Sequence, residues 1–82
     1  MKKIKVIKED LSQYELECGG GYADPKTRRV FIDSTLSKEK QQLITVHEVL
    51  ELDLTDHINE FVIPHSYLDV IAKDILSSLE QL

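Results

Sequence analysis

The chain has 82 residues, of which 41% are hydrophobic and 30% charged, and its formal net charge at pH 7 is −5. These proportions are typical of a globular domain, and the length fits one domain over residues 1–82 with a modest core. The negative net charge argues against a nucleic-acid partner, because surfaces that bind phosphate backbones are rich in lysine and arginine.

Cys18 is the single cysteine of the chain, so an intrachain disulfide is excluded and a reducing compartment is favoured. No apolar run reaches the length of a membrane span, which argues against a membrane partner. Lys2 and Lys3 are followed by alternating charges instead of the apolar core of a signal peptide. The sequence therefore predicts a cytoplasmic protein.

Alternating apolar and polar residues predict three short strands, at residues 3–8, 14–18 and 28–33. The glycines at 19–21 interrupt this pattern and predict a bend or bulge. A phosphate-binding loop is the weaker interpretation, because the turn residues at 24–27 follow the glycines where a phosphate loop requires a helix.

Two amphipathic helices are predicted, from about residue 38 to about 54 and from about residue 66 to about 81. Ser37 is the expected N-cap of the first helix. The apolar face of the second helix is expected to bury Leu68, Ile71, Ala72, Ile75, Leu76 and Leu79. Residues 61–64 are apolar but too short to assign to a strand or a loop. The predicted fold class is α+β, with a small three- to four-stranded sheet covered on one face by two packed helices.

Residues 45–51 of the first helix contain the sequence His-Glu-x-x-Glu. His47 and Glu51 are four residues apart, so they lie within about 40° of each other around the helix and could bind one metal ion. Leu43, Leu50 and Leu54 are expected on the same side of the helix, so His47 and Glu51 project from its apolar face.

A catalytic zinc site needs three protein ligands and an open position for water. His47, Glu51 and His65, which opens the second helix, would supply two imidazoles and a carboxylate, and Glu48 would act as general base. His57 is the rival third ligand, and Asp69 could orient the ring of His65 or replace it. The alternative is a purely structural cluster of hydrogen-bonded core residues.

The strand-to-helix part of the chain resembles the core of small zincin-type metallopeptidases. The resemblance rests on Gly21-Tyr22, Arg29-Val30-Phe31-Ile32-Asp33, Leu36, Glu39 and Thr45-Val46-His47-Glu48. Glu48-Val49-Leu50-Glu51, followed by Pro64-His65 at a helix start, is similar to a group of short phage and bacterial zincin-like proteins that carry His-Glu-x-x-Glu and a downstream histidine. The similarity spans roughly residues 21 to 76.

This resemblance implies a zinc ion bound by His47, Glu51 and His65, with Glu48 as the base in peptide-bond hydrolysis. It also implies that the strand at residues 29–33 lies at the sheet edge and pairs with an extended peptide; the simpler alternative is an edge strand without a ligand. Two other functions are a catalytically silent metal-binding or protein-interaction module and, more remotely, iron chemistry of the two-histidine-one-carboxylate kind.

Overall fold

The computed structural model describes residues 3–14, 19–57 and 64–82, except for the side chains at positions 56, 57 and 65. The elements in chain order are β1 (Lys5–Glu9), β2 (Gly21–Asp24), β3 (Arg29–Asp33), α1 (Lys38–His57) and α2 (His65–Leu79). The predicted α+β class, a small sheet with two helices, is confirmed. No helix in these residues is both long and apolar enough to span a bilayer.

The strand β2 is the element that sequence patterns did not predict. It begins at Gly21, where only a bend or bulge was expected, and ends where the expected turn begins. Of the predicted strand at 14–18, Tyr14 lies in a turn and donates its backbone N–H to Leu11 O at 3.0 Å. Residues 15–18 and 61–63 lie outside the described part of the chain.

The strand β3 lies in the middle of the sheet, whose order is β1-β3-β2. It pairs with β1 in parallel and with β2 antiparallel. The prediction that residues 29–33 form a sheet edge is therefore wrong. The physical reason is burial: Val30 and Ile32 are both completely buried, and a strand with two buried inward residues is stabilised most when neighbours cover both of its sides.

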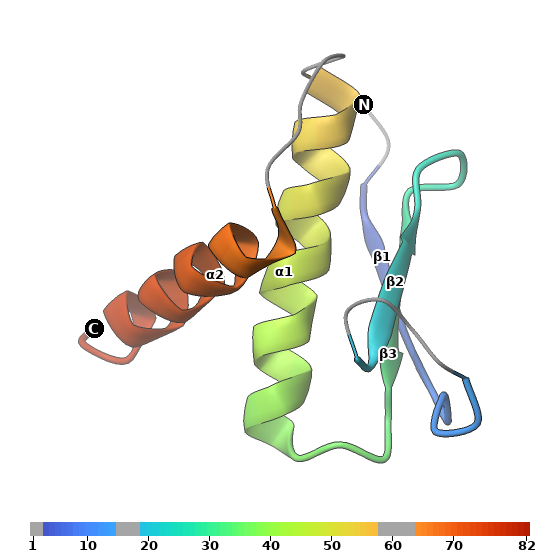
Figure 1. Ribbon diagram of the computed structural model, residues 1–82, viewed down its shortest axis with the longest axis horizontal. Coiled ribbons are helices and arrows are strands. Elements are labelled where there is room, and N and C mark those ends of the chain that lie inside the picture. The colour runs from blue at the N-terminus through green and yellow to red at the C-terminus, as the bar shows by residue number, and fades with distance from the viewer. Residues whose placement is uncertain (1–2, 15–18, 58–63) are drawn as a thin grey trace.

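The helix α1 lies between the sheet and α2, as Figure 1 shows. Its contact with the sheet forms the core, in which Leu52 packs with Val30 and Ile32. The partly buried residues around this core are Ile4, Ala23, Ile44 and Val49. On its other side α1 contacts α2, whose Leu68 and Ala72 are fully buried. Because α1 is buried on two sides, residues that project toward either neighbour are shielded from water.

The connection from β3 to α1 is fixed by Asp33, which is buried at the end of β3. Its Oδ1 accepts hydrogen bonds from the Thr35 N–H at 3.0 Å, the Thr35 hydroxyl at 2.7 Å and the Leu11 N–H at 3.3 Å. The bonds from Thr35 lower the pKa of Asp33, because they stabilise its ionised form. The Lys40 N–H donates to Ser37 Oγ at 3.3 Å, so Ser37 caps α1 as predicted.

Gly21 allows β2 to lie close to α1. A Cβ atom at this position would stand 2.5 Å from Ile44 Cγ2 and 3.0 Å from Phe31 O. We expect Gly21→Ala to lower the free energy of unfolding by roughly 1–3 kcal/mol, the usual cost of overpacking. Urea denaturation measures this cost. It should shrink in an Ile44→Ala background, where the obstructing methyl is gone; an equal cost in both backgrounds would contradict the steric explanation.

Candidate metal centre

Three ionisable side chains of α1 gather at one place on the helix. His47, Glu48 and Glu51 each offer one ligand atom, and these atoms all lie within 4.8 Å of one another. Helix geometry accounts for this, since residues 47 and 51 are four apart and residues 48 and 51 are three apart, and both spacings place side chains on one face of a helix. Imidazole and carboxylate are ordinary ligands of divalent metals, so this group could hold a metal ion.

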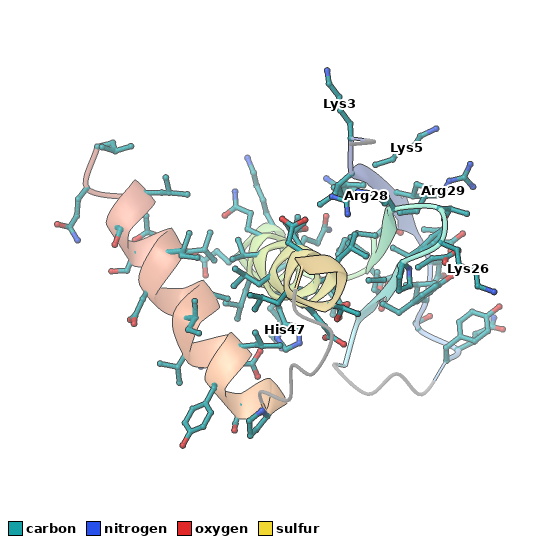
Figure 2. All side chains as sticks on the ribbon, turned by 90° about the horizontal axis from the view of Figure 1, so that it is seen from above. Lys3, Lys5, Lys26, Arg28, Arg29 and His47 are labelled. Atoms are coloured by element: carbon teal, nitrogen blue, oxygen red, sulfur yellow. The ribbon has the colours of Figure 1, made fainter. Side chains whose placement is uncertain are left out.

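His47 is held in a defined orientation by α2. The ring is only 2% exposed, and its Nδ1 lies 2.7 Å from Asp69 Oδ1. Figure 2 shows His47 projecting from α1 on the flank between α2 and the sheet. An ionised carboxylate can only accept a hydrogen bond, so Nδ1 carries the ring hydrogen and donates a hydrogen bond to Asp69 Oδ1. In the neutral ring the lone pair is then on Nε2, the form that binds metals.

The other ring nitrogen of His47 faces the second candidate ligand. Its Nε2 lies 3.4 Å from Glu51 Oε2. Two ligand atoms on one tetrahedral zinc ion are separated by about 3.3–3.5 Å, as bond lengths of 2.0–2.2 Å require. The observed distance is at the outer limit of a hydrogen bond but matches the spacing of two ligands on a shared ion. The donor set and its spacing therefore fit a metal ion.

Glu48 is the most deeply buried acidic residue of this group, with 2% of its surface exposed. A buried carboxylate is costly unless hydrogen bonds, an ion pair or a cation compensate for the lost water. Its ligand atom lies within 4.8 Å of those of His47 and Glu51, so Glu48 is close enough to be a ligand itself.

Of the residues singled out from the sequence, the structure brings His47, Glu48 and Glu51 together. His65 is the first residue of α2, but its side chain, like that of His57, lies outside the described residues. Asp69 was expected to orient the ring of His65 or to replace it as a ligand, and the structure shows that it contacts His47.

The sequence does contain a pattern that indicates the direction of the Asp69 side chain. Asp69 follows Leu68 and precedes Ala72 by three residues, and these are the two residues by which α2 is buried against α1. A carboxylate next to those positions on the helix surface is directed toward the same neighbour. The pattern does not identify the residue of α1 that faces Asp69, because this depends on how α1 and α2 pack.

A small cavity of about 200 Å³ adjoins the ring of His47. It is lined by Gly19, Lys40, Leu43, Ile44, His47, Asp69 and Lys73. Sites for whole small molecules usually measure about 300–1,000 Å³. This space suits one side chain or a few waters, so a larger substrate would have to lie mostly on the surface.

Comparison with known proteins finds no matching family model, no matching curated protein and no matching solved structure. The likeness to zincin-like proteins therefore stays a prediction from the His-Glu-x-x-Glu sequence and its context.

Proposed function

We propose that the chain is a minimal zinc metallopeptidase. In this proposal His47, Glu51 and His65 hold zinc, and Glu48 is the general base. The observation that carries it is the pair of contacts at His47. The ring nitrogen Nδ1 lies 2.7 Å from Asp69 Oδ1, and Nε2 lies 3.4 Å from Glu51 Oε2. A ligand histidine oriented by a carboxylate is the usual arrangement in zinc sites.

The residues of the chain would divide the reaction between them. Bound zinc would supply Lewis acidity, which makes a nearby water more acidic and polarises the substrate carbonyl. Glu48 would take a proton from the attacking water while the oxygen of that water bonds to the carbonyl carbon. The same carboxyl would then give this proton to the amine nitrogen as the carbon–nitrogen bond breaks. Asp69 would keep the lone pair of His47 Nε2 directed at the metal position.

The substrate would be an extended peptide. Because β3 has a neighbouring strand on each side, the peptide would have to pair with another strand. Within the described sheet, β2 is an outer strand, and Gly20 and Gly21 bring it against Ile44 of α1. Ile44 is one helical turn before His47 on α1. A peptide added along β2 would thus pass close to the site, with its main chain held by strand pairing.

A second candidate is a catalytically silent metal-binding or protein-interaction module, of the kind suggested by the likeness to short phage and bacterial proteins. Two observations favour it. Glu48 is only 2% exposed, which restricts access to a substrate, and the cavity beside His47 measures only about 200 Å³. In this case the ion would stabilise the packing of α1, as structural metals do in small domains.

Substituting Glu48 with glutamine separates the two functions. We expect Glu48→Gln to retain zinc and to lower the rate of peptide hydrolysis by roughly 100-fold or more, because the amide cannot accept the proton. Peptide-library cleavage followed by mass spectrometry, with zinc content determined on the same samples, provides the measurement.

The control is Glu39→Gln, which changes an exposed glutamate in the first turn of α1 and should leave both properties unchanged. Hydrolysis that survives in Glu48→Gln at the wild-type rate would contradict the mechanism. A wild-type protein that zinc stabilises against heat, but that cleaves no peptide, would support the silent module.

A further inference from the structure

The sheet has a face that the helices leave uncovered. Both helices lie on one side of it (Figure 1), and Val30 and Ala23 point to that side. Residues that alternate with them point to the opposite side. By the strand register these outer residues form rows across the sheet: Lys5, Arg29 and Asp24 in the first, Ile7, Phe31 and Tyr22 in the second, and Glu9 with Asp33 in the third.

The middle row of this outer face is apolar and aromatic. The rings of Tyr22 and Phe31 are stacked, with centroids 4.6 Å apart and planes inclined by 15°. Tyr22 is 39% exposed, and Phe31 and Ile7 are partly exposed. Such rows on an antiparallel or mixed sheet normally pack against a second layer.

One end of the outer face is positively charged. Lys5 and Arg29 are exposed and lie in register. Lys3, two residues before Lys5, and Lys26, in the turn between β2 and β3, belong to the same end of the sheet, and Figure 2 labels all four side chains. Arg28, which is labelled beside them, forms an ion pair with Asp53 at 3.0 Å. Among the described residues, the exposed cations at this end of the sheet are therefore Lys3, Lys5, Lys26 and Arg29, which outnumber the carboxylate of Asp24 in the same row.

The other end of the outer face is negatively charged and hollowed. A cavity of about 390 Å³ there is lined by Glu9, Asp10, Leu11, Tyr14 and Tyr22. Asp10 accepts hydrogen bonds from the hydroxyl and N–H of Ser12, which lower its pKa and keep it ionised at neutral pH. Carboxylates beside exposed phenol rings form a receptor for an organic cation such as a lysine or arginine side chain.

We propose that this outer face binds a second copy of the chain. A twofold axis lying across the strands, over the row of Ile7, Phe31 and Tyr22, would bring the positive end of each copy against the negative end of the other. Lys5 would then face Glu9 of the second copy, and Arg29 would reach its hollow. The apolar rows would pack on each other, in the isologous arrangement of most homodimers.

A second copy fits this face better than a nucleic acid does, because Glu9 and Asp10 would repel a phosphate backbone. The contact is small. Three strands of about five residues cover roughly 14 Å by 17 Å, well below the ~800 Å² per partner of a stable interface. The expected dimer is therefore weak and reversible, with a dissociation constant in the micromolar range or above.

Charge reversal at Lys5 and Glu9 tests the arrangement independently of metal and of hydrolysis. Sedimentation equilibrium should show concentration-dependent dimerisation of the wild type. Lys5→Glu alone and Glu9→Lys alone should each weaken it by roughly tenfold or more, because each leaves like charges facing across the axis. A mixture of the two variants should associate again, since the Lys5→Glu copy carries two acids where the Glu9→Lys copy carries two lysines.

The control is Lys38→Glu, which makes the same change in net charge at the start of α1 and should dimerise as the wild type does. A wild type that stays monomeric at millimolar concentration would overturn the proposal. So would a mixture of Lys5→Glu and Glu9→Lys that associates no better than either variant alone. A monomer that binds an oligonucleotide through Lys5 would assign the face to a polyanion and would equally overturn it.

Discussion

Replacing His47 with alanine is expected to lower the affinity of the chain for zinc by about 100- to 1,000-fold. Structural zinc sites bind with about 10–16 kcal/mol over four ligands, so one ligand contributes roughly 2.5–4 kcal/mol. The loss should be large here, because His47 is the only imidazole in the described His/Glu/Glu group. Competition with a fluorescent zinc chelator would measure the affinity at fixed pH.

Histidine variants outside this group provide the comparison for His47→Ala. If His65 is the third ligand, His65→Ala should weaken zinc binding by a similar factor, and His57→Ala should bind zinc as the wild type does. Circular dichroism of the metal-free proteins would establish that each variant is folded. Unchanged zinc affinity in a folded His47→Ala protein would show that the chain binds zinc at another site.

Replacing Asp69 with asparagine is expected to lower zinc affinity by roughly 10- to 100-fold, although Asp69 would not touch the ion. Its Oδ1 accepts a hydrogen bond from His47 Nδ1, with 2.7 Å between the two atoms, and its side chain is 54% exposed. An amide oxygen is a weaker acceptor for the Nδ1 hydrogen bond than a carboxylate, and the amide can also turn its NH₂ group toward Nδ1, which would favour the other tautomer of the ring. The same chelator competition would measure the effect.

A second readout of Asp69→Asn is independent of metal. Long-range ¹⁵N–¹H spectra of the metal-free wild type should show the His47 proton on Nδ1, and the variant should show a mixture of tautomers. Asp74→Asn is the matched control, because Asp74 is an exposed aspartate of the same helix. Equal zinc affinities of the Asp69 and Asp74 variants would contradict the positioning role of Asp69.

The fold was predictable where it depends on local pattern. The start of α1 and its N-cap follow from the apolar periodicity after Ser37, although α1 ends at His57, about three residues beyond the predicted end. The α+β class follows from short strands succeeded by two helices. Strand order was not predictable, because alternation in residues 29–33 shows that the strand is half-buried but does not identify its neighbours. The strand β2 was missed because Gly21 is a weak strand residue whose role is close packing against Ile44.

The candidate site was also predictable only in part. The proximity of His47, Glu48 and Glu51 follows from helix geometry alone, since all three belong to α1. The contact between His47 and Asp69 joins two helices and depends on how Leu68 and Ala72 seat α2 on α1. Sequence patterns correctly placed Leu68 and Ala72 on the buried side of α2, but Ile71 and Leu79, expected on the same face, are 38% and 55% exposed. The patterns also do not specify which residue of α1 each side chain meets.

Calorimetric titration of the metal-free chain with zinc, on the wild type and on Glu51→Gln, is the most direct test of the claim that His47 and Glu51 share one ion. We predict binding of one zinc ion per chain by the wild type, and an affinity at least about tenfold lower in Glu51→Gln. A wild type that binds no zinc, or a Glu51→Gln variant that binds it with unchanged affinity, would contradict the claim.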